Sequence, residues 1–144
     1  IENNLFLYLK DLSKVKPLIG ICLGMQLFAK SSEESEGISG LDLIPGKVVK
    51  MKSKISHTGW NSLIGKNDDI QMGFEKYINK FFYFNHSYEY ITDRRNIILY
   101  SNFQRKIATI VKKDNVIGFQ FHPEKSQVNG VGLLKSTLDY FLNA

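Results

Sequence analysis

The stretch GICLGMQ, residues 20–26, decides how this chain of 144 residues is built. It places the single cysteine, Cys22, between two glycines and directly after the apolar run PLIGI at residues 17–21. This pattern predicts a buried strand that turns sharply into a helix, with the thiol exposed at the turn. Gly20 and Gly24 are expected to leave room where a Cβ atom would collide. A helix N-terminus favours thiolate over thiol, so we predict a nucleophilic cysteine with a lowered pKa.

A second apolar run, VIGFQF at residues 116–121, leads directly into HPEK at residues 122–125. Residues two apart in an extended segment point the same way, so His122 and Glu124 are expected to project together from the strand end. A carboxylate that holds an imidazole facing a thiol is the arrangement of nucleophile, base and orienting group that acyl transfer uses. The alternatives are a buried structural Cys22 and an ordinary structural histidine. Found together at two strand ends, the residues favour a catalytic site.

The spacing of apolar residues predicts an alternation of helices and strands along the chain. Helices are expected over residues 2–13, from residue 23 to about residue 30, and over residues 130–142. Strands are expected over residues 17–21, 46–51, 81–90, 96–102, 106–111 and 116–121. The later strands follow one another at hairpin spacing, which predicts a mixed sheet rather than a purely parallel one.

Composition sets limits on the function. The length and the 43% of hydrophobic residues suit one domain over residues 1–144. The net charge of +5 comes from lysines and arginines scattered among acidic residues, so we expect no nucleic-acid partner. One cysteine excludes an internal disulfide, and the histidines lack metal-ligand spacing, so no metal is expected. No run of about 20 apolar residues or leader segment is recognised, and we expect a cytosolic protein that does not meet a membrane.

Three motifs resemble those of the class I, triad-type glutamine amidotransferases: GICLGMQ at residues 20–26, HSY at residues 86–88 and QFHPEKS at residues 120–126. Two further segments, GLDLIPGKVV at residues 40–49 and HTGWN at residues 57–61, resemble the glutaminase subunit of imidazole glycerol phosphate synthase. The likeness runs from the nucleophile strand to the C-terminus. One departure is Ser56, which stands where that subfamily usually has a proline.

The resemblance implies an α/β fold, an open mixed sheet flanked by helices. Members of the family also carry an N-terminal strand and a Pro-Gly-rich loop whose backbone N–H completes the oxyanion hole. Neither is found here, so the domain is expected to be N-terminally incomplete. The N–H of Leu23 then remains as the one oxyanion donor, and such a donor is typically worth about 10²–10³ in rate.

The chemistry that the resemblance implies is hydrolysis of the glutamine side-chain amide to glutamate and ammonia. Cys22 attacks the carboxamide carbon and forms a glutamyl thioester, His122 gives a proton to the departing ammonia, and Glu124 orients the imidazole. No cofactor is implied. Four further positions match residues that contact the substrate: Gln26, which is one helical turn beyond the nucleophile, Glu34, and the backbone of Ser87 and Tyr88. For Glu34 ordinary helix-end polarity is an equal alternative, and His86 is more simply a structural residue.

The resemblance also implies a partner, because ammonia released into water is protonated and wasted. A synthase subunit docked over the site, forming a heterodimer, would receive ammonia and make imidazole glycerol phosphate in histidine biosynthesis. Trp60, Asn61 and Lys125 are the expected interface residues; the alternative for Trp60 is a place in the core. Three other functions stay open: glutaminase for surface-sugar amination, a stand-alone γ-glutamyl hydrolase, and an inactive regulatory subunit.

Overall fold

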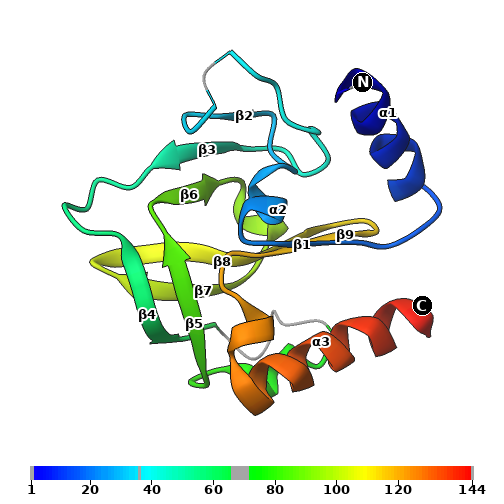
Figure 1. Cartoon of the computed structure of the whole chain (residues 1–144). Helices are drawn as coiled ribbons and strands as arrows, with labels where there is room; N and C mark the ends of the chain where they lie inside the picture. Colours follow the sequence, from blue (N-terminus) through cyan, green and yellow to red (C-terminus); the bar gives the residue numbers. More distant parts are fainter. Residues whose placement is uncertain (1, 36, 66–71, 144) are drawn as a thin grey trace.

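The computed structural model of the chain describes residues 2–35, 37–65 and 72–143, and its main sheet has four strands in the order β1-β9-β8-β7 (Figure 1). The strands are β1 (Leu18–Ile21), β9 (Val116–Phe119), β8 (Arg105–Lys113) and β7 (Ile97–Phe103). β1 runs parallel to β9, whereas β8 is antiparallel to both of its neighbours. The prediction of a mixed sheet is therefore confirmed.

Two smaller sheets lie beside the main one. The first joins β2 (Ser31–Ser32), β3 (Lys47–Lys50) and β6 (Tyr88–Ile91), and the second is the antiparallel pair of β4 (His57–Ser62) and β5 (Phe81–His86). Isolated bridges connect Tyr83 with His122 and Ile64 with Tyr100. The β4–β5 pair is thus tied to the segment that follows β9, where the candidate site lies.

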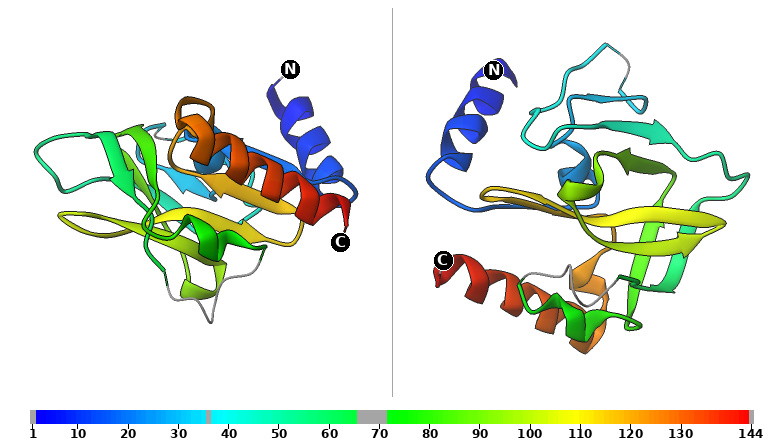
Figure 2. Two further views of the ribbon diagram at one scale, coloured as in Figure 1. Left: turned by 90° about the horizontal axis from the view of Figure 1, so that it is seen from below. Right: turned by 180° about the vertical axis from the view of Figure 1, so that it is seen from behind.

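Helices cover both faces of the main sheet. The helices are α1 (Glu2–Ser13), α2 (Leu23–Gln26) and α3 (Gln127–Leu142), with 3₁₀ turns η2 (Phe74–Tyr77), η3 (Arg94–Asn96) and η4 (Pro123–Lys125). Along β9, Ile117 and Phe119 pack in one cluster with Leu133 of α3, while Val116 packs in a second cluster with Met25 of α2. Figure 1 and the right-hand view of Figure 2 place α1 and α3 on opposite sides of β1 and β9. In the described ranges, no helix is long and apolar enough to span a bilayer.

A pair of glycines lets α2 lie directly on the sheet. Gly20 of β1 is opposite Gly118 of β9. A Cβ atom on Gly118 would lie 2.5 Å from the Met25 side chain, and one on Gly20 would lie 2.5 Å from the Phe28 ring. The expected steric role of Gly20 is confirmed. For Gly24 it is wrong, because a Cβ atom there would have nothing within 4 Å.

The helix predicted from residue 23 to about residue 30 ends much earlier, at Gln26. The carbonyls that would continue it are used by a distant loop: Leu27 accepts from the N–H of Leu41, and Ala29 accepts from the N–H of Asp42. A carbonyl paired in this way no longer needs the N–H four residues ahead. Glu34, expected near the helix end, instead lies in a turn beyond β2.

The single strand predicted over residues 81–90 is two strands that belong to different sheets. β5 ends at His86 and pairs with β4, and β6 begins at Tyr88 and pairs with β3. His86 Nδ1 lies 2.7 Å from the Tyr88 carbonyl oxygen, which fixes the bend at Ser87. The partner strand β4 was not predicted, and it contains the whole HTGWN segment at residues 57–61.

Candidate active site

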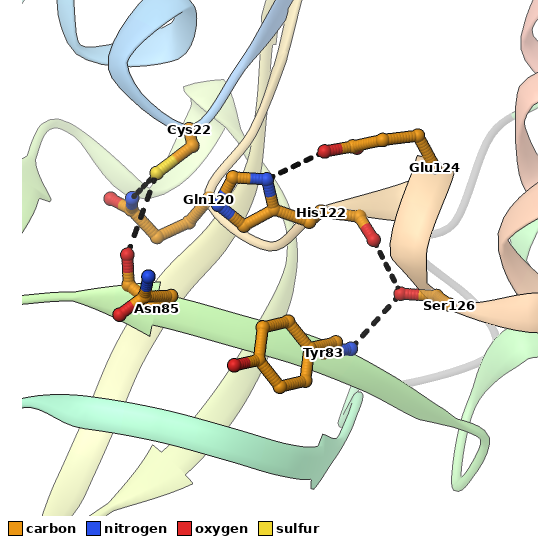
Figure 3. Close-up of polar contacts among 7 residues, drawn as sticks. All are labelled: Cys22, Tyr83, Asn85, Gln120, His122, Glu124 and Ser126. Atoms are coloured by element: carbon orange, nitrogen blue, oxygen red, sulfur yellow. Dashed lines mark hydrogen bonds and ion pairs between the residues drawn. The ribbon is translucent and has the colours of Figure 1, made fainter.

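Cys22 lies at the sharp turn between β1 and α2, as predicted. Its backbone has φ 51° and ψ −105°, a strained conformation for a residue that carries a side chain. The backbone N–H donates to the Phe119 carbonyl over 2.7 Å, which holds the turn against the end of β9. Two contacts engage the sulfur (Figure 3): the Asn85 carbonyl oxygen at 3.8 Å and Gln120 Nε2 at 3.9 Å.

Burial raises the pKa of the Cys22 thiol, and the nearby charges of Glu124 and Glu34 raise it further. The Leu23 N–H lowers this pKa, although its effect is smaller than that of burial. The predicted lowering of the pKa is therefore wrong for the free chain. The helix that was expected to favour the thiolate is a single turn, so few aligned peptide dipoles act on the sulfur. The raised pKa favours the thiol form of Cys22.

His122 and Glu124 form a close pair beyond the end of β9. His122 Nδ1 lies 2.7 Å from Glu124 Oε1, and in Figure 3 the carboxylate approaches the ring from the side away from Cys22. The contact was predicted, but its cause is different: residues 123–125 form η4, so the chain turns back instead of continuing as a strand. A carboxylate accepts the Nδ1 proton, so in this tautomer Nε2 is the ring nitrogen with a free lone pair.

The backbone around His122 is tightly held. Its N–H donates to the Tyr83 carbonyl over 2.8 Å, and its carbonyl accepts from the Ser126 hydroxyl over 2.6 Å. The same hydroxyl accepts from the Tyr83 N–H over 2.9 Å (Figure 3). In the part of the chain that the structure describes, no hydrogen bond joins Cys22 to His122. The thiol and the imidazole come from neighbouring strand ends, but the thiol is directed to other partners.

Three residues predicted to serve the site line one small pocket beside α2. They are Leu23, Gln26 and Glu34, and Phe6 of α1 lines the same pocket. Gln26 is buried, and its Nε2 lies 3.4 Å from the Tyr88 carbonyl oxygen. Glu34 is exposed, yet near enough for its charge to act on the Cys22 thiol.

Ser87 and Tyr88, the other predicted binding positions, are partly buried at the bend between β5 and β6. The Ser87 carbonyl accepts from the Met51 N–H over 2.9 Å. The hydroxyl oxygens of Ser87 and Ser56 are 2.7 Å apart. The residue that departs from the subfamily pattern, Ser56, therefore contacts a predicted binding position directly.

The predicted interface residues lie on the surface next to this site. Trp60 is 48% exposed and has an edge contact with Tyr83, which pairs with it across the strands, so the alternative of a core tryptophan is wrong. Asn61 is partly buried, and its amide donates to the Asn102 carbonyl over 2.9 Å. Lys125 is exposed on η4.

Two residues that contact the Cys22 thiol were not predicted from the sequence as site residues: Asn85 and Gln120. Gln120 lies two residues before His122, and the alternation along the extended segment could have indicated it. Asn85 could not be found in this way, because it reaches Cys22 from a strand of another sheet. Within residues 2–35, 37–65 and 72–143, no group of three or more histidine, cysteine or acidic side chains could hold a metal ion.

Comparisons with known proteins identify the family of the chain. The family model for glutamine amidotransferase class-I matches residues 3–137. The chain is 43% identical to imidazole glycerol phosphate synthase subunit HisH of Carboxydothermus hydrogenoformans over 138 residues, covering 94% of this chain and 69% of that protein. It is 35% identical to the subunit of the same name from Thermotoga maritima, covering 99% of this chain and 68% of the relative. The chain thus spans about two thirds of the length of these relatives.

Solved structures show the same fold. The structure of PurLQS from Thermotoga maritima aligns with a TM-score of 0.68 at 21% identity, over 92% of this chain and 66% of that chain. A glutamine amidotransferase from the same organism aligns with a TM-score of 0.59 at 18% identity, over 96% of this chain and 55% of that chain. These alignments show a shared fold, and the family match together with the HisH relatives shows that the chain belongs to the class I glutamine amidotransferase family.

Proposed function

We propose that this chain is the glutaminase subunit of an imidazole glycerol phosphate synthase. It hydrolyses glutamine to glutamate and ammonia and passes the ammonia to a synthase subunit in histidine biosynthesis. The observation that carries the proposal is the His122–Glu124 pair, 2.7 Å apart, at the strand end next to the Cys22 turn. It occurs in a chain 43% identical to a protein named HisH.

The proposed reaction divides one difficult step into two easier ones. His122 Nε2 takes the proton of the Cys22 thiol, and the sulfur forms a bond to the carboxamide carbon of glutamine. The imidazolium then returns its proton to the nitrogen, the C–N bond breaks, and ammonia leaves a glutamyl thioester. In the second step His122 takes a proton from water and the hydroxide attacks the thioester carbon. The C–S bond then breaks, glutamate is released, and the imidazolium returns its proton to the Cys22 sulfur. Glu124 stabilises the imidazolium in both steps.

The first step requires a change at the sulfur. The resting thiol faces Asn85 and Gln120, and burial raises its pKa. A rotation of the Cys22 side chain toward His122 would supply both a base and a cationic partner for the thiolate. The Leu23 N–H already lies beside the sulfur and would donate to the oxyanion that develops on the substrate.

The pocket beside α2 suits the other end of glutamine. Glu34 carries a negative charge for the α-ammonium group, and Gln26 lines the same pocket and contacts the Tyr88 carbonyl oxygen. The backbone of Ser87 and Tyr88 is proposed to bind the substrate beside Gln26. The partner surface is proposed at Trp60, Asn61 and Lys125, so that the synthase subunit covers the site as a heterodimer. The reaction uses only side chains, backbone and water, and we assign it to the reducing cytosol because the one cysteine must stay a thiol.

A covalent label tests this assignment. The protein with its synthase subunit is treated with a glutamine-like chloroketone, and the adduct is located by mass spectrometry. We expect labelling at Cys22, protection by glutamine, and loss of both labelling and glutaminase activity in Cys22→Ser. Full activity in Cys22→Ser would overturn the assignment of the nucleophile. No adduct and no turnover would indicate an inactive subunit.

The partner and the ammonia acceptor need a second measurement. Glutamine turnover is followed with and without the synthase subunit, and transfer of the amide ¹⁵N of glutamine to the product is followed by NMR. We expect turnover to rise when the synthase binds and the label to enter its product. A rate of glutamine turnover that is the same with and without the synthase would instead support a stand-alone γ-glutamyl hydrolase. Transfer only to an amino sugar would support a role in surface-sugar amination.

A further inference from the structure

Two of the three histidines, His57 and His86, form a buried pair that the proposed reaction does not use. They are 2% and 6% exposed. His57 Nδ1 and His86 Nε2 are 2.9 Å apart across the β4–β5 pair. The rings of Phe84 and Phe103 stack on the two sides of His57, each with its centroid 4.2 Å from the imidazole. The hydrophobic rings exclude water, so each ring nitrogen must find a partner within the protein.

The hydrogen bonds of this pair run in one direction. A carbonyl oxygen only accepts, so His86 Nδ1 carries a proton and donates to Tyr88. His86 Nε2 is then an acceptor and receives the Nδ1 proton of His57. His57 Nε2 is an acceptor in its turn and receives a proton from the Asn61 amide over 3.0 Å. Burial lowers the pKa of His57 to about 3 and that of His86 to about 4, so both rings stay neutral and keep these roles.

The same chain of contacts continues past the Tyr88 carbonyl to the nucleophile. Gln26 Nε2 lies 3.4 Å from that carbonyl oxygen and 3.3 Å from Gln120 Oε1. Gln120 Nε2 lies 3.9 Å from the Cys22 sulfur (Figure 3). Polar contacts therefore lead without a gap from the surface strand β4 to the thiol, by way of two residues predicted to bind glutamine.

We propose that His57 and His86 are positioning residues for glutamine hydrolysis, which hold the Tyr88 carbonyl and connect the partner-facing Asn61 to the Cys22 thiol. The proposal rests on the proposed function. Its physical basis is that a buried hydrogen-bond network in which every group is paired has one low-energy arrangement. A displacement at one end of the network therefore shifts the groups at the other end. A synthase subunit that contacts Asn61 would thereby change the positions of the Cys22 thiol and of the residues that bind glutamine.

Two substitutions at His86 separate this role from simple packing. His86→Asn places an amide N–H near the position of Nδ1, so it can still donate to the Tyr88 carbonyl. His86→Gln reaches the position of Nε2, so it can still accept from His57 but loses the donor to Tyr88. We expect His86→Gln to raise the KM for glutamine about 10-fold or more, a typical size for coupling between sites. His86→Asn should remain within about threefold of the original value.

A matched control is Tyr77→Phe, which removes a partly buried hydroxyl contact with Ser136 at 3.0 Å, away from the site. It should lower the melting temperature without a change in KM. Equal losses of stability in both His86 variants, with unchanged KM and kcat in each, would show that the pair is only structural and would overturn the proposal. Absence of glutaminase turnover in the unaltered protein with its synthase would instead contradict the proposed function.

A second readout does not depend on turnover. The rate at which iodoacetamide alkylates Cys22 depends on the position and the hydrogen-bond partners of the thiol. We expect His86→Gln and Asn61→Ala each to change this rate and the double variant to show a non-additive effect, as residues in one network do. Strictly additive effects would contradict the connection between Asn61 and the thiol, whether or not the protein is a glutaminase.

Discussion

The His122 region and the His57–His86 region use the same side chain in opposite ways. The His122 side chain is 18% exposed and contacts a carboxylate, whereas His57 and His86 are buried among phenylalanine rings and contact neutral groups. A carboxylate stabilises an imidazolium, and an apolar enclosure opposes it. These surroundings fit the proposed roles, in which His122 transfers the proton while His57 and His86 only hold geometry.

The largest effect is expected from His122→Ala, which removes the proposed proton carrier. In the complex with the synthase, kcat for glutamine hydrolysis should fall about 10⁴-fold or more, as for other enzymes that lose their base. Steady-state kinetics measures this, and Tyr77→Phe serves as the folded control. If His57→Ala or His86→Ala reduced kcat as strongly while His122→Ala was mild, the assignment of the two regions would be reversed.

Acid should destabilise the protein through the buried pair. The pKa values of about 3 for His57 and about 4 for His86 lie below the ordinary value of 6.5. Their contribution to stability is complete above pH 6.5 and is lost as the pH falls toward 4 and 3, because the unfolded chain binds the protons first. At about 1.4 kcal/mol for each pKa unit, we expect a loss of about 3 kcal/mol or more between pH 6.5 and 4.5.

Urea unfolding at pH 7.5, 6.5 and 4.5 measures this loss, and the double variant His57→Gln with His86→Gln is the control. Glutamine does not titrate, so the difference in pH dependence between the two proteins belongs to the pair. Parallel curves for the two proteins would mean that the histidines are protonated in the folded state, and the one-directional hydrogen bonds described above could not persist.

A smaller effect is expected from Glu124→Gln. The amide still accepts a hydrogen bond from His122 Nδ1 but no longer stabilises the imidazolium, and the carboxylate side chain is already 46% exposed to solvent. We expect kcat to fall about 10- to 100-fold, less than for loss of the base itself. The pH profile of kcat/KM checks the cause, and a loss as complete as that of His122→Ala would mean that the charge is indispensable.

The features that were predicted correctly depend on residues near one another in the sequence. The turn at Cys22 follows from the apolar strand before it and from Gly20, and the contact between His122 and Glu124 spans two residues. The end of α2 at Gln26 and the break at Ser87 were not predicted, because they are fixed by hydrogen bonds to segments far along the chain. The pKa of the Cys22 thiol was misjudged for the same reason, since its burial is a property of the whole fold.

The pairing of His57 with His86 shows this limit most clearly. The sequence favours a structural role for His86, and that expectation agrees with its burial. The partner, however, is 29 residues away and lies on a strand that the pattern of residues 57–62 did not predict. Gly59 and Asn61 of that strand have low strand propensity, so the sequence pattern does not indicate an extended conformation. The pairing with β5 imposes that conformation.

The smallest effect concerns the surface at which the buried chain of contacts begins. Trp60, next to Asn61, exposes 48% of its surface, and an exposed tryptophan can contribute strongly to binding. Trp60→Ala should weaken association with the synthase by about 2 kcal/mol, or roughly 30-fold in Kd, and should lower ammonia transfer while the fold is kept. Calorimetric titration measures the affinity, and substitution of the exposed Val131 of α3, Val131→Ala, is the control. Unchanged affinity, together with turnover that never responds to the synthase, would show that Trp60 of β4 does not take part in partner binding. This result would favour the stand-alone hydrolase.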